Sequence, residues 1–346
     1  MKRYNVAIVG ATGAVGTEML RVLQQHRFPI KRLRLLASSR SKGRRIPFNG
    51  STYTVEELQN RSFGGVDVAL FSAGAARSLE FGPEAVRRGA VVVDNSSAFR
   101  MAKNVPLVVP EINPHALKSH RGLIANPNCS TIIMLLPLAP LHRAAGLKRI
   151  TVSTYQSVSG AGAKAMAQLL RETRQALRQC RVSGAALRVN AKLAGAAHSP
   201  LPEQIAFNVV PQVDVFLDNG STKEEMKMVN ETRKILEASR LPISATCVRV
   251  PVLVSHSEAV WIETDRPLSV EKARRILRGA AGVKLVDEAG AYPLPIDAAG
   301  QDDVLVGRIR RDESVPHGLA LWVSGDNLRK GAATNAVQIA ELLFRR

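Results

Sequence analysis

Cys129 lies in a stretch that could make a thiol reactive. Residues 126–131 follow an apolar run expected to be a strand, and the apolar run 132–136 comes next, so Cys129 is placed at or near a helix N-terminus. There the helix dipole and free N–H groups lower a thiol pKa and can hold an oxyanion. The pattern predicts a nucleophilic cysteine, whereas Cys180 and Cys247, in helical or apolar settings, are expected to be inert.

A glycine-rich turn close to the N-terminus predicts a site for a dinucleotide. A β-branched run at 4–9 leads into Gly-Ala-Thr-Gly-Ala-Val-Gly at 10–16, and residues 13–25 repeat apolar side chains at helical spacing. Glycines permit a tight turn and close backbone approach, and N–H groups at the helix N-terminus can hold a pyrophosphate. A plain strand-to-helix turn is the alternative. The residues assigned to the cofactor are Gly10, Ala11, Thr12, Gly13, Ala14 and Val15.

The end of the second expected strand indicates which dinucleotide is used. Folds that prefer NAD place a carboxylate there, but residues 37–42 read Ala-Ser-Ser-Arg-Ser-Lys. Ser38, Ser39 and Arg40 can bind a 2'-phosphate instead, which predicts a preference for NADP over NAD. A solvated basic loop is the alternative. Ser72, directly after another expected strand, is assigned to the same cofactor.

The elements that must position these residues fall into two groups. Up to about residue 150, short apolar strands alternate with helices, which predicts an α/β fold with a Rossmann-like, doubly wound parallel sheet. Later strands are longer and alternate in polarity, which predicts a mixed sheet in an α+β catalytic and dimerisation domain. Strands are expected at 4–9, 33–36, 66–71, 90–94, 122–125, 150–156, 246–254, 258–264, 304–309 and 319–323, and helices at 13–25, 76–88, 163–179, 223–237, 270–278 and 327–344.

This division suggests where the domains begin and end. We expect an NADP-binding domain at 1–128, a catalytic and dimerisation domain at 129–328, and a C-terminal helix at 329–346 that returns to the first domain. Pro137 and Pro140 interrupt the apolar run after Cys129, so the helix there is expected to end or kink within two turns.

The composition is that of a soluble globular protein with an unusual charge. Of its 346 residues, 45% are hydrophobic and 22% charged, and 48 Lys and Arg against 29 Asp and Glu give a formal net charge of +19. That charge favours anionic partners. A specific nucleic-acid partner is disfavoured, because only 4% of the residues are aromatic and no nucleic-acid-binding signature is recognised.

Cysteine usage and hydropathy bear on location. The three cysteines are far apart and form no CxxC pair, so neither a disulfide framework nor a metal site is predicted, and a reducing cytoplasm fits best. The longest apolar stretch, residues 131–141, is far shorter than the ~20 residues that span a membrane, so no membrane partner is expected.

Seven short blocks, in the same order as in a known family, cover nearly the whole chain. They are residues 10–16, 95–100, 126–131, 155–162, 223–227, 249–256 and 326–331. Together they resemble the aspartate-semialdehyde dehydrogenase family. The resemblance implies NADPH-dependent reductive dephosphorylation of L-4-aspartyl phosphate to L-aspartate 4-semialdehyde and phosphate, on the route to lysine, threonine, methionine and isoleucine. It also implies a homodimer or homotetramer assembled through the second domain.

The resemblance implies a covalent mechanism centred on Cys129. The thiolate attacks the acyl phosphate, and hydride from NADPH reduces the resulting thioacyl-enzyme. His256 matches the family's acid/base histidine, and Asn128 and Gln156 match amides that position the thioacyl group. The other histidines are expected to be structural or solvated; they are His26, His115, His120, His142, His198 and His317.

The same resemblance assigns the substrate's charged groups. Arg249 grips the α-carboxylate, Glu224 reaches the α-amino group, and Arg100 and Lys227 hold the phosphate, with Gln156 beside the substrate. Glu224 and Lys227 are three residues apart on an expected helix and can share one face, where a plain surface ion pair is the alternative. Ser159, Gly160 and Asn327 match positions beside the nicotinamide.

Other functions remain open at this level. A related acyl-phosphate reductase, such as an N-acetyl-glutamyl-phosphate reductase or a glyceraldehyde-phosphate dehydrogenase-like protein, would share the nucleophile. An acetylated amine, however, gives no reason for the acidic Glu224. A basic nucleic-acid-binding protein on a borrowed fold and a catalytically inactive relative are the remaining alternatives.

Overall fold

The glycine-rich turn joins the first strand to the first helix of a doubly wound sheet, as expected. The sheet order is β3-β4-β2-β1-β5-β6-β7, and of the described strands in this sheet only β3 runs antiparallel to its neighbour. The strands are β1 (Tyr4–Val9), β2 (Ile30–Ala37), β3 (Arg45–Phe48), β4 (Ser51–Glu57), β5 (Val68–Phe71), β6 (Val91–Asp94) and β7 (Leu123–Ala125). Since the chain order reverses between β1 and β5, a ligand crevice is expected at their carboxyl ends.

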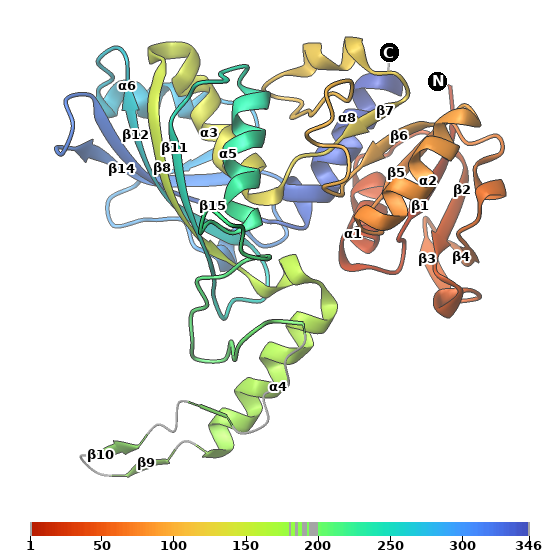
Figure 1. The fold of residues 1–346 in the computed structure, drawn as a ribbon, viewed down its shortest axis with the longest axis horizontal. Helices are drawn as coiled ribbons and strands as arrows, with labels where there is room; N and C mark the ends of the chain where they lie inside the picture. The colour runs from red at the N-terminus through yellow and green to blue at the C-terminus, as the bar shows by residue number, and fades with distance from the viewer. Residues whose placement is uncertain (1, 180, 184–185, 189–191, 194–199, 345–346) are drawn as a thin grey trace.

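Helices cover both faces of this sheet in the computed structural model, which describes residues 2–179, 181–183, 186–188, 192–193 and 200–344. The helices are α1 (Ala14–Gln25), α2 (Ala75–Arg87) and α8 (Thr334–Phe344). Side chains of α1 and α8, such as Met19 and Ile339, share one buried cluster, and Phe81 of α2 belongs to another. The last helix therefore lies beside the first, with the two chain ends near one another (Figure 1).

The second sheet is mixed, as expected, and one of its faces is covered by helices. Its order is β11-β8-β12-β15-β14-β13, and β12 pairs antiparallel with both neighbours. The strands are β8 (Leu147–Gln156), β11 (Ile243–Arg249), β12 (His256–Thr264), β13 (Val283–Val286), β14 (Val304–Asp312) and β15 (Gly318–Gly325), and the helices are α3 (Cys129–Ala145), α5 (Lys223–Ile235), α6 (Val270–Arg278) and α7 (Pro295–Ala298). The largest buried cluster lies between α3, α5, α6 and this sheet.

The sequence predicted that α3 would end or kink within two turns; the helix does not end there but continues for 17 residues through both prolines. Each proline removes one helical hydrogen bond and costs about 3 kcal/mol in an isolated helix. Here almost every residue from Ser130 to Leu141 is buried in the core. Packing on all sides therefore holds the helix where local propensity alone would break it.

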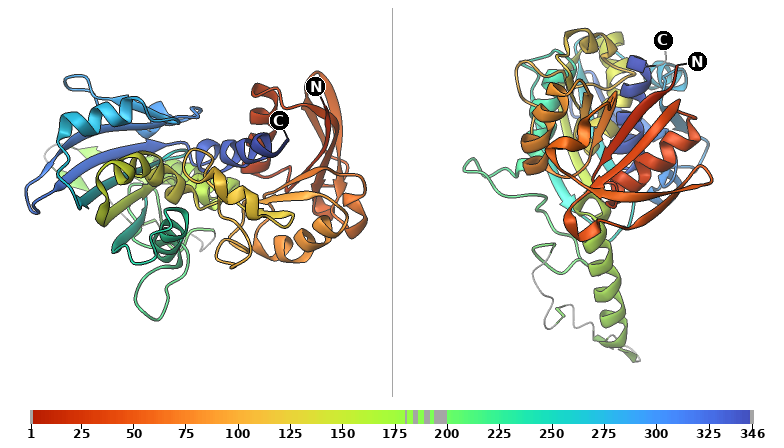
Figure 2. Two further views of the ribbon diagram at one scale, coloured as in Figure 1. Left: turned by 90° about the horizontal axis from the view of Figure 1, so that it is seen from above. Right: turned by 90° about the vertical axis from the view of Figure 1, so that its right-hand side faces the viewer.

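A long arm projects from the second lobe. It consists of α4 (Ala163–Gln179), with the bounds expected from the sequence, and a short hairpin of β9 (Arg181–Ser183) and β10 (Ala186–Arg188). Figure 2 shows the helix standing away from both sheets. Part of the helix still packs inward, where the buried Glu172 accepts hydrogen bonds from the backbone of Ile205 and Ala206.

Three further details depart from the expectations. The sequence reading missed the short strands β3, β4, β9, β10 and β13 and the short helix α7. Strand β11 ends at Arg249 and not at 254, because Pro251 cannot donate to a ladder. The C-terminal helical segment begins with a π-helical turn, η5 (Arg329–Ala333). Among the described residues, no helix is both long and apolar enough to cross a membrane.

Candidate active site

Cys129 opens into a pocket of about 420 Å³ between the two lobes. It is the first residue of α3, and Asn128 caps that helix by accepting a hydrogen bond from the Thr131 N–H at 3.1 Å. Gly331 of η5 lies directly against the cysteine, since a Cβ at this glycine would be 2.9 Å from the Cys129 Cβ. The predicted helix N-terminus is therefore in place, and glycine is required opposite it.

His256, the first residue of β12, is a titratable group in direct contact with the thiol. Its Nε2 lies 3.4 Å from the Cys129 Sγ. The Ser157 backbone N–H donates to Nδ1 at 3.0 Å, so the neutral ring carries its proton on Nε2, directed at the sulfur. In the other tautomer Nδ1 would carry the proton and could donate it to the Ser157 hydroxyl at 3.1 Å. That proton would then face the hydrogen of the Ser157 backbone N–H. The contacts thus favour His256 as a donor.

Both members of this pair are neutral in the free protein at pH 7. Burial, together with the charge of Glu224, raises the pKa of the Cys129 thiol to about 11. Burial and the charge of Arg249 lower the pKa of His256 well below its usual value. The expectation that the helix N-terminus would leave a lowered thiol pKa is therefore wrong. The loss of solvent outweighs the helix end and the nearby guanidinium groups.

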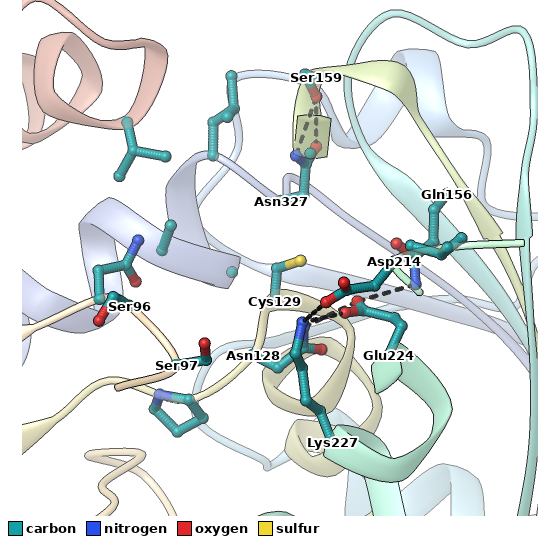
Figure 3. A pocket seen from close by; sticks show the side chains of 18 of the residues that line it. Ser96, Ser97, Asn128, Cys129, Gln156, Ser159, Asp214, Glu224, Lys227 and Asn327 are labelled. Atoms are coloured by element: carbon teal, nitrogen blue, oxygen red, sulfur yellow. Dashed lines mark hydrogen bonds and ion pairs between the residues drawn. The ribbon is translucent and has the colours of Figure 1, made fainter. Parts of the chain in front are cut away.

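Glu224 of α5 lies at the centre of the pocket's hydrogen-bond network (Figure 3). One oxygen accepts from the Asn128 amide at 2.8 Å and the Gln156 amide at 3.3 Å, and the other accepts from the Lys227 ammonium at 3.0 Å. Lys227 also donates to Asp214 at 2.7 Å. The cations and amides lower the pKa of Glu224 despite its burial, so the carboxyl is ionised. The expectation that Glu224 and Lys227 share one helix face is confirmed.

The two buried arginines of the pocket are held differently. Arg249, at the end of β11, donates to the Ser157 carbonyl oxygen at 2.8 Å, and Glu224 acts on it through space. Arg100 donates to Glu231 of α5 at 3.0 Å and to the Asn95 carbonyl oxygen at 2.9 Å. Burial raises the pKa of the Glu231 carboxyl, and Arg100 opposes that rise.

The glycine turn fits a bound pyrophosphate. Gly10 has φ of +90°, and a Cβ there would be 2.5 Å from the Ser72 carbonyl oxygen, so a larger residue would be strained in conformation and in space. Gly13, the N-cap of α1, makes no side-chain cap, which leaves the first N–H groups of the helix available to an anion. Ser72 and the turn 10–15 lie together at the carboxyl ends of β5 and β1.

The predicted 2'-phosphate loop is exposed beside this turn. Ser38, Ser39 and Arg40 are exposed at the end of β2, around the short helix η1 (Ser39–Ser41). The Ser41 hydroxyl lies 3.3 Å from the Thr12 hydroxyl, which connects this loop to the glycine turn. The described side chains leave Arg40 without a partner carboxylate, so its charge is available to an anion.

The predicted nicotinamide residues form the edge of the pocket between the glycine turn and Cys129. Ser159 and Gly160 lie on the short helix η4 (Val158–Ala161), and both line the pocket with Val15 and Asn327. The Asn327 Oδ1 accepts from the Ser255 N–H at 2.9 Å, and its Nδ2 donates to the Ser159 hydroxyl at 2.9 Å. The Asn327 side chain therefore links the backbone at Ser255 to the side chain of Ser159.

The structure brings the residues predicted for substrate and catalysis to one place. Those that line the pocket directly are Arg100, Asn128, Cys129, Gln156, Glu224, Lys227 and Arg249, with His256 buried behind the sulfur. The sequence reading missed Asp214, Ser157, Glu231 and Gly331. Glu231 was detectable, because it lies seven residues after Glu224 on the same helix face. Two predicted inert residues, Cys180 and His198, fall outside the described residues.

Two family models match this chain. The model described as semialdehyde dehydrogenase, NAD binding domain covers residues 5–120, and the model described as semialdehyde dehydrogenase, dimerisation domain covers residues 138–330. The fold and the site therefore define a semialdehyde dehydrogenase, a two-domain oxidoreductase that binds a nicotinamide dinucleotide.

Full-length relatives specify the family. Aspartate-semialdehyde dehydrogenase of Aquifex aeolicus is 50% identical over 99% of this chain and 98% of its own. The structure of aspartate semialdehyde dehydrogenase II from Vibrio cholerae, complexed with ASA, is 48% identical with a TM-score of 0.92, covering 100% and 99% of the two chains. The Candida albicans enzyme, solved with NADP, is 25% identical with a TM-score of 0.74, covering 99% and 98%. The chain belongs to the aspartate-semialdehyde dehydrogenase family, whose members are oxidoreductases of amino-acid biosynthesis.

Proposed function

We propose that this enzyme uses NADPH to convert L-4-aspartyl phosphate to L-aspartate 4-semialdehyde and phosphate, with Cys129 as the nucleophile, on the route to lysine, threonine, methionine and isoleucine. The observation that carries the proposal is the 3.4 Å contact between the Cys129 Sγ and the His256 Nε2. This contact lies in a pocket that also contains three cations and an ionised Glu224. Such a pocket suits a small substrate with two anionic groups and one ammonium group.

The substrate's groups are assigned to pocket residues by charge. Arg249 receives the α-carboxylate through its guanidinium fork, and Glu224 receives the α-ammonium group. Arg100 and Lys227 also line the pocket and receive the phosphate. Each of these cations already contacts a carboxylate or a carbonyl oxygen of the protein. An anionic group of the substrate therefore replaces such a contact when it binds.

The chemical steps use Cys129, the N-terminus of α3 and His256. The sulfur bonds to the acyl carbon while the carbon–oxygen bond to phosphate breaks, leaving a thioester and free phosphate. Asn128 and Gln156 position the acyl group, and N–H groups at the start of α3 stabilise charge on its oxygen. When bound, the nicotinamide supplies a hydride to the thioester carbon. The thiol proton passes to the His256 Nε2 as the sulfur attacks, which requires the less favoured tautomer with the proton on Nδ1. His256 then returns this proton to the oxyanion left by hydride addition. The carbon–sulfur bond breaks last, the proton passes to the sulfur, and the aldehyde leaves with Cys129 again a thiol.

NADP is the proposed cofactor, held by the glycine turn and the loop at residues 38–40. The exposed Arg40 and the absence of a carboxylate at the end of β2 support this preference. Ser159, Gly160 and Asn327 border the nicotinamide end of the site.

We also propose that the enzyme is a cytoplasmic homodimer or homotetramer. The face of the second sheet that no large helix covers carries Tyr155 and Trp322, whose rings are 5.3 Å apart, with Trp261 on the same side. Tyr155 is 38% exposed, so aromatic surface is available to a second copy. Sedimentation of the purified protein measures the oligomeric state.

The test of function is phosphate-dependent reduction of NADP with L-aspartate 4-semialdehyde. We expect turnover in the wild type, none with N-acetylglutamate semialdehyde, and a loss of at least about a thousandfold in Cys129→Ala. Cys247→Ala is the matched control, because Cys247 is a second free thiol, buried beside Met228 and not among the residues that line the pocket. Unchanged activity in Cys129→Ala would refute the mechanism.

A further inference from the structure

Glu231 is a buried carboxylate beside the pocket that the proposed mechanism does not use. It lies on α5, and its relative exposure is only 1%. A carboxylate in such a place is strongly unfavourable unless it is paired and hydrogen-bonded. Both of its oxygens are in fact engaged by groups that belong to the active site.

The two oxygens of Glu231 reach two different parts of the site. Oε1 accepts from the Arg100 Nη1 at 3.0 Å, and Oε2 accepts from the Asn128 backbone N–H at 2.6 Å. Arg100 comes from the segment after β6 in the first lobe, 131 residues away in sequence. Asn128 is the N-cap of the helix that begins with Cys129. A single carboxylate therefore joins an arginine of one lobe to the start of the nucleophile's helix.

Arg100 depends on this contact for its direction. Its Nη2 donates to the Asn95 carbonyl oxygen at 2.9 Å, and its Nε is buried without a hydrogen-bond partner among the described residues. Glu231 is thus the charged group that ion-pairs with the guanidinium in the described part of the chain. Without it, the arginine would keep only one neutral acceptor.

We propose that Glu231 is a positioning residue, which aims Arg100 at the phosphate and fixes Arg100 relative to the N-cap of the nucleophile's helix. The proposal rests on the assignment of Arg100 to the phosphate in the proposed function. It implies that loss of the carboxylate weakens phosphate binding more than binding of the aldehyde substrate, whose carboxylate and ammonium groups are assigned to Arg249 and Glu224.

The test is steady-state kinetics of Glu231→Gln in the phosphate-dependent oxidation of L-aspartate 4-semialdehyde. Glutamine keeps the shape but has one acceptor oxygen, so its NH2 group must face either Arg100 or the Asn128 N–H. We expect the KM for phosphate to rise roughly tenfold or more, as for the loss of a charge-assisted hydrogen bond. The KM for the aldehyde is expected to stay within about twofold, since this contact does not reach Arg249.

Glu172→Gln is the matched control. Glu172 is also buried, at 5% exposure, and accepts two backbone N–H groups, but it lies on α4 and does not line the pocket. This variant reports the cost of losing a buried carboxylate without touching Arg100, so its KM for phosphate is expected to match that of the wild type.

A double-mutant cycle with Arg100→Ala separates positioning from general destabilisation. If Glu231 acts through Arg100, adding Glu231→Gln to Arg100→Ala changes the KM for phosphate by less than about twofold. Equal rises in both KM values, or additive effects in the cycle, would overturn the proposal. If Glu231→Gln does not fold, Glu231→Asp, which keeps the charge on a shorter side chain, undergoes the same measurements and is judged by the same outcomes. Failure of the proposed function would show separately, as a wild type without phosphate-dependent turnover.

Discussion

The two halves of the active site are built on different principles. The dinucleotide half consists mainly of backbone from one short segment, where Gly10 and Gly13 shape a turn at the carboxyl end of β1. The substrate half consists of side chains from both lobes, and contacts such as Arg100 to Glu231 join residues 131 positions apart. The first half depends on conformation, and the second on a set of mutually compensating charges.

Charge balance is the more informative part of this comparison. The substrate half contains the cations Arg100, Lys227 and Arg249 and the carboxylates Glu224, Glu231 and Asp214, three of each sign. Although the chain carries +19, its pocket is therefore close to neutral. The positive surplus lies elsewhere and does not account for binding of the substrate.

Among the variants that test this comparison, the largest effect is expected from adding a side chain to the glycine turn. In Gly10→Ala the new Cβ would be 2.5 Å from the Ser72 carbonyl oxygen at φ of +90°. Strain of about 2–3 kcal/mol weakens NADP binding by roughly 30- to 150-fold. Fluorescence titration with NADPH measures the affinity.

Gly65→Ala is the control for this prediction, because Gly65 also has positive φ, +70°, but has open space where a Cβ would be added. It shares the conformational strain without the clash and lies away from the turn. Equal loss of NADPH affinity in both variants would show that the dinucleotide half does not depend on close backbone approach.

The second prediction tests the exposed edge of the same half. Arg40→Ala is expected to lower the preference for NADPH over NADH by about tenfold, because one charge-assisted contact to a 2'-phosphate is lost. The ratio of kcat/KM values for the two cofactors measures the preference. Lys42→Ala is the control, since Lys42 is two residues away and already lies 3.5 Å from Glu57. A wild type with no preference between the cofactors contradicts the assignment.

The same contrast explains what the sequence could predict. The strand, turn and helix around Gly10, and the placing of Cys129 at the start of α3, follow from local periodicity and were predicted correctly. The passage of α3 through Pro137 could not be predicted, because packing of distant strands offsets the local cost. The pKa of Cys129 was predicted in the wrong direction for a similar reason, since burial is a property of the assembled lobes.

The third prediction changes the charge balance of the substrate half. Burial raises the Cys129 pKa to about 11, and the charge of Glu224 adds to the rise. Glu224→Gln removes a negative charge, which favours the thiolate and lowers the thiol pKa. The measurement is the rate of Cys129 alkylation by iodoacetamide from about pH 7 to above about pH 10, a range that includes the ordinary thiol pKa. The pH at which this rate rises is expected to be lower in the variant than in the wild type.

Controls for the alkylation experiment come from the same chain. Cys129→Ala reports any reaction at other thiols, and Glu172→Gln removes a buried carboxylate far from the sulfur. If Glu224→Gln and the wild type give superimposable pH profiles, local charge does not set the reactivity of Cys129. The two halves would then not differ in their dependence on charge.

The last prediction concerns the pH dependence of stability near the substrate half. Glu258 is fully buried on β12, two residues after His256, and both carboxyl oxygens lack a hydrogen-bond partner among the described residues. Burial raises its pKa well above the usual value of 4.5, so the native state keeps a proton that the unfolded chain releases. The contribution of this group to stability therefore falls as the pH rises from about 4.5 toward the raised pKa. Glu258→Gln, which cannot ionise, is expected to gain about 1–3 kcal/mol over the wild type at high pH and much less near pH 4.5.

Urea unfolding of Glu258→Gln and the wild type at several pH values measures that difference. Glu263→Gln, on the same strand, provides a control of opposite sign. Glu263 lies 2.7 Å from Lys148, and that contact lowers its carboxyl pKa, so the charged form stabilises the fold above the usual pKa and is lost as the pH falls. The stability gap between Glu263→Gln and the wild type should therefore change with pH in the reverse direction. Parallel pH curves for Glu258→Gln and the wild type would mean that the folded protein in solution stabilises the ionised Glu258 carboxylate. The buried charges of the substrate half would then be balanced throughout, including beneath His256.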